Sequence, residues 1–233
     1  CQALAKAAFA DPRIALGRAL SSANSINVGR LLPQLAYHGA AAILQWRASG
    51  RAAPWVVPSG NVGNATAALW ARACGLPIGR VVLAANANRA VLDWVTTGAA
   101  AARPTVATVA NAMDVGAPSN LERLVALFPD GVAGLTAHSV DDDAIRARIR
   151  WAASTWGVDV CPHTACGVEA WIRDGADPEA VLVATAHPAK FEQVVEPLVG
   201  HAVPVPPALA EILARPWRRE IVEPTLDAIV AAL

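Results

Sequence analysis

The residues best suited to chemistry form a short glycine-rich segment, PSGNVGN at 58–64. It stands between a predicted buried strand over 54–57 and a predicted helix over 64–74. Glycines at such a junction allow backbone N–H groups to converge on one point, and the helix adds the positive end of its dipole. The pattern therefore predicts a site for a phosphate or another anion. A plain tight turn between strand and helix is the alternative.

This segment differs from two well-known phosphate-binding sequences. It lacks the Gly-Lys-Ser/Thr ending of the P-loop, which disfavours a nucleoside triphosphate with magnesium. It also lacks the third glycine of the dinucleotide fingerprint. The phosphate-bearing ligand is therefore of another kind.

The cysteines and histidines do not form a metal-binding pattern. The segment CPHTAC at 161–166 has no zinc-ribbon spacing, and no second pair is placed to complete a tetrahedral site. The cysteines at 1, 74, 161 and 166 do not resemble a secreted disulfide framework. We therefore expect reduced thiols, no metal and a cytoplasmic location.

Alternating helices and short apolar strands must position these motifs. Predicted strands cover 54–57, 81–84, 158–160 and 181–184, and predicted helices cover 31–48, 64–74, 139–151, 164–172, 207–214 and 224–233. A strand, helix and strand in sequence favour a right-handed crossover between parallel strands. The expected class is α/β, with a mostly parallel sheet flanked by helices.

Two of these helices carry more specific expectations. Within 31–48, the spacing predicts that Leu32, Leu35, Ile43 and Leu44 face the core. The three aspartates at 141–143 open the helix over 139–151, where negative charge complements the positive helix terminus. A metal role for the three aspartates is the weaker alternative.

Composition excludes several classes of protein. The 233 residues include 19 basic and 19 acidic side chains, so a nucleic-acid or polybasic membrane surface is not expected. No stretch approaches the ~20 apolar residues that span a bilayer. The chain begins at Cys1, without methionine and within a predicted helix. We expect a fragment whose upstream part is missing, and a processed mature end is the alternative.

Five segments together resemble threonine synthase in its long bacterial and fungal form, a fold-type II pyridoxal-phosphate (PLP) enzyme. They are SANSINVGR at 22–30, PSGNVGN at 58–64, NAMDVGAPSN at 111–120, PHTA at 162–165 and TAHPAKF at 185–191. Each segment alone is a weak signal, but their order and spacing cover nearly the whole chain. The resemblance implies that 1–233 is part of a PLP-dependent domain, the large-domain portion of such an enzyme without its N-terminal part.

The resemblance also implies an activity. In this family, a PLP-dependent carbon–oxygen lyase converts O-phospho-L-homoserine and water to L-threonine and phosphate, the last step of threonine biosynthesis. The family's Schiff-base lysine lies in a Gly-Pro-Thr…Phe-Lys-Asp motif. This chain has only Lys6 and Lys190, and neither stands in that motif. We therefore expect no catalytic lysine here and no activity from the chain alone.

Roles follow from the resemblance for the loop and for one threonine. The loop residues match those that hold the phosphate of PLP: Gly60, Asn61, Val62, Gly63 and Asn64. Thr185 matches the partner of the pyridine nitrogen. A hydroxyl does not stabilise a protonated ring nitrogen as a carboxylate would, which suits elimination rather than transamination. A threonine that satisfies backbone groups at a strand end is the alternative.

A second group matches the segment that holds the substrate's phosphate. Asn24 and Ser25 would add neutral donors, and Arg30 is suited to bidentate binding of an oxyanion. An exposed arginine and a helix-capping serine are the alternative.

Histidines are harder to interpret. His163 and His187 lie in matching segments, where each could position a substrate or move a proton, and a hydrogen-bonded structural role is the alternative. His38, His138 and His201 have no supporting context. Asp114 and Asn120 belong to a matching segment without an evident mechanism.

Two other functions remain open at this point. A serine or threonine dehydratase would share the phosphate loop but should lack the segment at 24–30. A non-enzymatic phospholigand-binding protein would explain the missing lysine. The residues encoded upstream of Cys1 would discriminate among these functions, and the oligomeric state is left open.

Overall fold

A computed structural model of the chain describes residues 2–15, 20–216 and 219–232. Cys1 and Leu233, the last residue of a predicted helix, lie outside these ranges. The chain divides into two compact units, Cys1–Ala23 with Val205–Leu233, and Asn24–Pro204. All the predicted site residues fall within the second unit.

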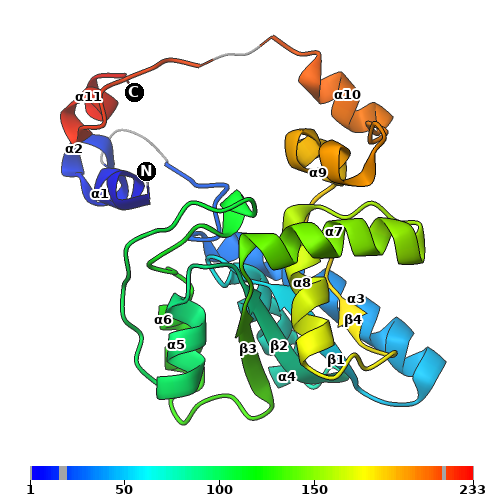
Figure 1. Cartoon of the computed structure of the whole chain (residues 1–233). Helices are drawn as coiled ribbons and strands as arrows, with labels where there is room; N and C mark the ends of the chain where they lie inside the picture. Colours follow the sequence, from blue (N-terminus) through cyan, green and yellow to red (C-terminus); the bar gives the residue numbers. More distant parts are fainter. Residues whose placement is uncertain (1, 16–19, 217–218, 233) are drawn as a thin grey trace. The chain divides into compact units, whose positions relative to one another are not determined.

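The second unit is built on a four-stranded parallel sheet in the order β3-β2-β1-β4 (Figure 1). The strands are β1 (Ala53–Pro58), β2 (Ile78–Ala85), β3 (Leu135–Ser139) and β4 (Val181–Leu182). Val56 in the middle of β1 pairs with Val82 on one side and Leu182 on the other. This confirms the predicted parallel α/β class.

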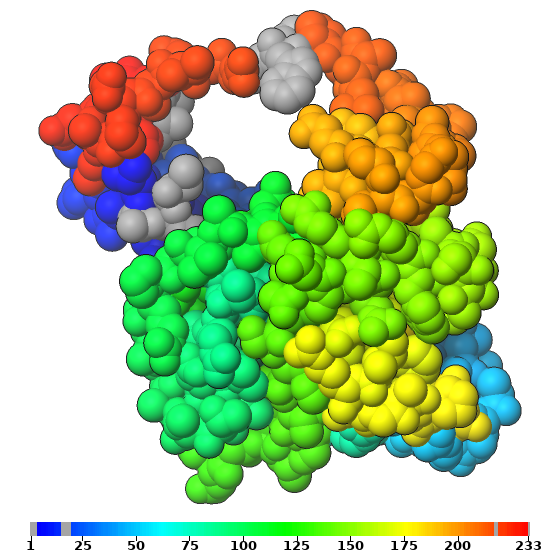
Figure 2. Space-filling model, viewed as in Figure 1, coloured from blue at the N-terminus to red at the C-terminus, as the bar shows by residue number. Residues whose placement is uncertain are grey.

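Helices cover both faces of this sheet. One face packs against α3 (Leu31–Ser49), α4 (Gly63–Ala73), α5 (Ala90–Thr97) and α6 (Leu121–Leu127). The other packs against α8 (Pro162–Arg173), which is covered in turn by α7 (Asp142–Trp156). In Figure 2 the atoms of α7 and α8, coloured from green to yellow, lie in front of part of the sheet. Beyond them, α9 (Glu192–Val199) packs on α7.

Burial on both faces explains the apolar sequence of β1. All six of its residues are buried. Trp55 and Val57 lie in the core shared with α4, while Val56 and Pro58 approach Gly167 of α8. A strand covered on both faces reads as a continuous apolar run, which is why this strand could be predicted.

Part of the prediction for α3 was wrong. Its buried positions are Leu31, His38, Gly39 and Ala42. Leu35 packs partly against the core as predicted, but Leu32 and Leu44 are 58% and 66% exposed, and Ile43 is exposed as well. Leu31 and Ala42 are each buried one position before a predicted residue, and His38 and Gly39 complete the buried face.

The predicted strand over 158–160 is also wrong. These residues lie outside any strand, and the Val158 N–H donates to the Ala152 carbonyl near the end of α7. Because β1 is already paired with β2 and β4, residues 158–160 have no place beside it. Conversely, the analysis of the sequence did not predict β3, α5, α6 or α9.

Acidic residues at the start of α7 act as expected. Asp141 is the N-cap, and its side chain accepts a hydrogen bond from the Ala144 N–H at 2.8 Å. Within the described ranges, no group of three or more His, Cys, Asp or Glu residues is suited to hold a metal ion.

The first unit consists of short helices: α1 (Gln2–Ala10), α2 (Pro12–Ala15), α10 (Pro207–Leu213) and α11 (Leu226–Ala232). Helix α1 contacts α11, and Arg13 forms an ion pair with Asp227 at 2.8 Å. Ala8 and Ile14 are buried there. In the part of the chain that the structure describes, no helix has both the length and the apolarity needed to cross a bilayer.

Candidate functional site

A cavity of about 330 Å³ lies beyond the carboxyl ends of β1 and β4. Its wall comes from the loop at 58–64, the turn at 112–113, His163 of α8 and the segment from 185 to 191, with Ser25 and Gln34. Among the described lining residues there is no aspartate or glutamate, while Lys190 adds a positive charge. Carboxyl ends of parallel strands are where α/β proteins bind ligands, and this wall suits an anion.

The glycine loop connects β1 directly to α4. Ser59 holds its beginning, because its N–H donates to the Ala84 carbonyl at 2.8 Å and its hydroxyl to the Val57 carbonyl at 2.9 Å. Val62 then adopts a left-handed conformation with φ of 62° while its side chain stays buried. A β-branched residue rarely adopts this conformation, and such strain concentrates at functional sites.

Two glycines in the loop are required by close packing. A Cβ atom on Gly60 would stand 2.5 Å from Cα of Met113, and one on Gly63 would stand 2.8 Å from Cβ of Ser25. Both distances are far inside van der Waals contact. The loop therefore fits against its neighbours only with glycine at these two positions.

Asparagine side chains join three distant segments of sequence. Asn61 Oδ1 accepts from the N–H and hydroxyl of Ser119 at 2.7 and 2.8 Å, and Asn61 Nδ2 donates to Ser25 Oγ at 2.7 Å. Asn120 Nδ2 donates to the Asn61 carbonyl at 3.0 Å and to Ser25 Oγ at 3.2 Å. These contacts give Asn120 a structural role that the sequence did not reveal: it joins Ser25 to the glycine loop.

Arg123 on α6 holds the segment that includes Ser25. Its guanidinium donates to the carbonyls of Ser25 at 3.0 Å and Ile26 at 2.6 Å, and also contacts Asn120 Oδ1. The analysis of the sequence did not consider Arg123, which lies just beyond a matching segment. Only the folded chain shows that it reaches back almost 100 residues.

The predicted substrate-phosphate residues are only partly brought to the cavity. Ser25 lines it, whereas Asn24 and Arg30 are exposed and outside its lining. Arg30 ends the short 3₁₀ helix η1 (Val28–Arg30). Its charge acts on Tyr37, whose pKa is raised by burial and partly lowered again by Arg30.

His163 stands in the first turn of α8 and is 3% exposed. Its Nε2 accepts the Ala112 N–H at 3.1 Å, and its Nδ1 has no hydrogen-bond partner among the described residues. Burial lowers the pKa of His163 to about 4; Asp114 opposes this shift, and Lys190 adds to it. The ring is therefore neutral at pH 7, with its proton on Nδ1.

Asp114 organises the wall behind the turn η2 (Asn111–Met113). Its Oδ1 accepts from Asn86 Nδ2 and Thr108 Oγ1, both at 2.7 Å, and from Asn88 Nδ2 at 3.3 Å. Its Oδ2 accepts the Thr108 N–H at 3.0 Å. This carboxylate thus fixes the chain around the turn that carries Met113.

Thr185 and His187 lie in the segment after β4. Thr185 lines the cavity, which agrees with its predicted position but does not test the role given to it. His187 Nδ1 accepts the Ala189 N–H at 3.2 Å and caps the 3₁₀ helix η3 (Pro188–Phe191), so its contact is structural. Both residues also border a second, more apolar cavity of about 620 Å³.

Several lining residues were missed by the analysis of the sequence. Met113, Lys190 and Phe191 stand inside matching segments but had no role assigned, and Gln34 stands outside them. The proximity of Lys190 to the phosphate loop depends on the parallel pairing of β4 with β1, which a sequence shows only indirectly.

Comparisons with known proteins agree with this geometry. A family model described as "Threonine synthase, C-terminal" matches residues 164–232. A threonine synthase from Serratia marcescens is 39% identical over 90% of this chain and 50% of its own length. The crystal structure of threonine synthase from Escherichia coli covers 100% of this chain and 55% of its own, with a TM-score of 0.90 and 34% identity.

A PLP-bound threonine synthase from Brucella melitensis superimposes on all of this chain and 56% of its own, with a TM-score of 0.84 and 29% identity. The parallel sheet and its flanking helices therefore define the class of fold-type II PLP enzymes. Within that class, the chain is a relative of the threonine synthases, which confirms the resemblance seen in the five segments. It spans about half the length of the curated relatives it matches.

Proposed function

We propose that this chain supplies the phosphate-binding half of a threonine synthase. The complete protein would convert O-phospho-L-homoserine and water to L-threonine and phosphate, with PLP as cofactor. One observation carries the proposal: the loop at 60–63 is hydrogen-bonded directly to Ser25, in a cavity lined by no acidic residue among those described. The loop that we assign to the cofactor's phosphate thus contacts, through Ser25, the segment that we assign to the substrate's phosphate, a segment that a dehydratase should lack.

The residues present fit an anionic ligand such as PLP. The loop is closed against Met113 and Ser25 so tightly that a Cβ atom would displace it. His163 offers a buried donor, Nδ1–H, that has no partner among the described residues. Such an unsatisfied donor is costly unless a ligand or water accepts from it. These features support a ligand that carries several hydrogen-bond acceptors.

Each group has a task within the proposal. Backbone N–H groups at 60–64 bind the phosphate of PLP, with the N-terminus of α4 behind them. The hydroxyl of Thr185, in the segment after β4, orients the ring. His163 stays neutral and holds a proton at its buried Nδ1. When bound, PLP supplies the electron sink for carbanion chemistry.

Binding of PLP tests this assignment. We expect the chain to bind PLP, followed by its absorbance and fluorescence, and Gly60→Ala to lower the affinity at least tenfold because the new methyl group collides with the Met113 backbone. Gly39→Ala is the matched control, since on α3 the three atoms nearest to its Cβ all belong to the flexible side chain of Leu76 and none to backbone. Equal affinities for wild type and Gly60→Ala would contradict the proposal.

A further inference from the structure

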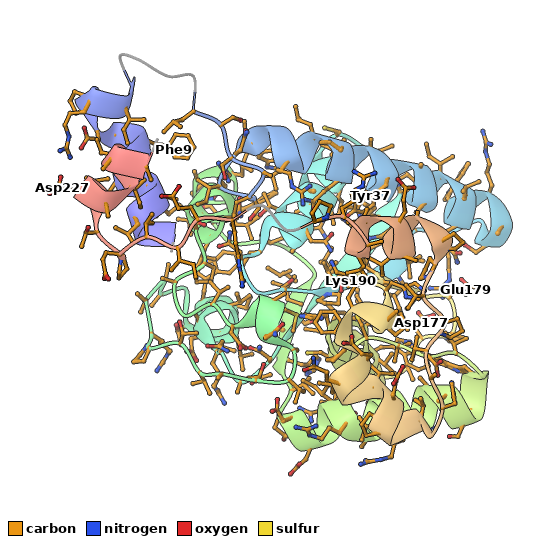
Figure 3. The ribbon with its side chains drawn as sticks, turned by 90° about the horizontal axis from the view of Figure 1, so that it is seen from above. Phe9, Tyr37, Asp177, Glu179, Lys190 and Asp227 are labelled. Atoms are coloured by element: carbon orange, nitrogen blue, oxygen red, sulfur yellow. The ribbon has the colours of Figure 1, made fainter. Side chains whose placement is uncertain are left out.

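Behind the glycine loop, a line of hydrogen bonds runs from β1 to the first turn of α4. Trp55 Nε1 donates to His38 Nδ1 at 2.9 Å, and both side chains are 1% exposed. His38 Nε2 lies 2.7 Å from Asn64 Oδ1. Tyr37, labelled on α3 in Figure 3, places its hydroxyl 3.0 Å from the same oxygen.

The chemistry of the indole group fixes the position of the proton on His38. Indole N–H only donates, so His38 Nδ1 must accept. Burial lowers the pKa of His38, so the ring is neutral and carries its single proton on Nε2. That proton is donated to Asn64 Oδ1. The opposite orientation of the Asn64 amide would require both nitrogens of His38 to accept, which a neutral imidazole does not allow.

The amide of Asn64 is therefore held in one orientation. Its oxygen receives hydrogen bonds from His38 and Tyr37, which leaves the two N–H groups of Nδ2 for another acceptor. Asn64 lines the cavity and is the last residue of the glycine loop. No hydrogen bond from Asn64 Nδ2 is present among the described residues.

We propose that Trp55 and His38 fix the Asn64 amide so that its Nδ2 donates to the anion held by the glycine loop. His38 is then a positioning residue, which acts on the ligand only through Asn64. This rests on the proposed function to the extent that the loop binds the phosphate of PLP. The chemistry itself requires only an oxyanion, so inorganic phosphate is a sufficient probe.

The first experiment determines the tautomer of His38. Long-range ¹H–¹⁵N correlation spectra of the chain labelled at histidine should show His38 with its proton on Nε2, in the absence and presence of inorganic phosphate. Trp55→Phe should allow the Nδ1-protonated form to appear, because the donor that excludes it is gone. A proton on Nδ1 in the wild type would overturn the proposal without any variant having to fold.

The second experiment is a double-mutant cycle on phosphate affinity. Asn64→Ala should weaken binding of inorganic phosphate about tenfold or more, since a hydrogen bond to a charged ligand is lost. His38→Leu should weaken it about three- to tenfold, and His38→Gln should stay within about twofold because its amide can both accept from Trp55 and donate to Asn64. In the Asn64→Ala background, His38→Leu should have no further effect.

If the two substitutions weaken phosphate binding independently, so that their effects multiply, the proposed relay from Trp55 through His38 to Asn64 is overturned. His38 would then act without Asn64. His138→Leu, on β3 and outside the cavity lining, controls for the loss of a histidine. Binding of phosphate without binding of PLP would refute the proposed function and leave the relay testable. If the wild-type chain binds no phosphate at millimolar concentration, Asn64 serves no anion and the relay is wrong.

Discussion

His163 is held neutral by its surroundings, and this has a consequence for stability. Its pKa is lowered by burial to about 4 in the folded chain, against about 6.5 in an unfolded one. Between these values the unfolded chain binds more protons, so the folded state loses stability as the pH falls. Above pH 6.5 the contribution of His163 is complete.

Replacement of His163 should therefore flatten the dependence of stability on pH. Between pH 7 and pH 5, the wild type should lose about 2 kcal/mol of unfolding free energy through this residue. His163→Gln removes the titrating group and should lose that much less, as measured by urea unfolding at both pH values. His201 is an exposed control. Asp159 raises the pKa of His201, so the contribution of His201 to stability changes with pH in the opposite direction. Parallel losses in wild type and His163→Gln would contradict the shifted pKa.

Arg30 tests the separation of two phosphate sites. In the complete protein, Arg30→Ala should lower kcat/KM for O-phospho-L-homoserine roughly 10- to 150-fold, the effect of about 1.5–3 kcal/mol for a lost charge-assisted contact. The content of PLP, measured by absorbance, should not change, because the loop at 60–64 is untouched. Arg30→Lys should rescue only part of the loss, since an ammonium does not reproduce the planar fork.

The position of Arg30 makes this prediction demanding. Its side chain is exposed and outside the cavity lining in this chain. Loss of PLP with unchanged use of the substrate would show that the two phosphates are assigned the wrong way round. Equal losses of both would indicate a structural role for Arg30.

Among the elements, those that carry the phosphate loop were the easiest to predict. β1, α4 and β2 are buried and strongly patterned, so their apolar runs reveal them. β3 is an edge strand whose five residues are all only partly buried, and its sequence LTAHS has no clear alternation of apolar and polar residues. The register of α3 was missed because His38 and Gly39 occupy buried positions that a hydrophobic pattern does not detect.

Site residues could be predicted where a motif contains them and not where a tertiary contact recruits them. The glycine loop, Ser25, His163 and Thr185 were found through motifs and do line the cavity. Arg123 and His38 act through contacts to residues far away in sequence. No local pattern distinguishes an arginine of this kind from an ordinary surface cation.

Helix α6 positions the segment around Ser25 through Arg123. Arg123→Met removes the donors to the carbonyls of Ser25 and Ile26 while keeping the length of the side chain. We expect a loss of about 1–3 kcal/mol in unfolding free energy and faster amide hydrogen exchange in the segment 24–30. Arg146→Met on α7 is the matched control, because no hydrogen bond or ion pair of its side chain is found among the described residues. Unchanged exchange would show that Asn61 and Asn120 are sufficient.

The turn that carries Met113 depends on Asp114 in the same way. Asp114→Asn replaces an oxygen that accepts hydrogen bonds with a nitrogen that donates them, opposite Thr108, Asn86 and Asn88. We expect destabilisation by about 1–3 kcal/mol in urea unfolding and weaker PLP binding, since Met113 packs against the loop. Asp130→Asn, at an exposed position, should change neither quantity. A stable Asp114→Asn variant would show that the turn is held by packing alone.

At the scale of the whole molecule, the chain holds a binding cavity but lacks the family's lysine motif. Lys6 belongs to the helical unit that also contains α11, and Lys190 stands at the cavity wall within η3. Neither lies in a Gly-Pro-Thr…Phe-Lys-Asp sequence. The relatives are about twice as long as the part that this chain matches. Binding can therefore be measured on this chain and turnover on the complete protein.

We therefore expect the 233-residue chain to bind PLP without producing threonine. In the proposed function the loop at 60–64 would supply the affinity, whereas turnover would need a lysine placed to attach the cofactor covalently. The measurement is threonine formation from O-phospho-L-homoserine at saturating PLP, beside the complete protein as positive control. Borohydride reduction followed by peptide mapping would show whether Lys190, at the cavity wall, is modified only slowly and incompletely. Turnover by the chain alone in the ordinary enzymatic range, ~1–1000 per second, would refute this prediction, because Lys6 or Lys190 would then have to act as the catalytic lysine.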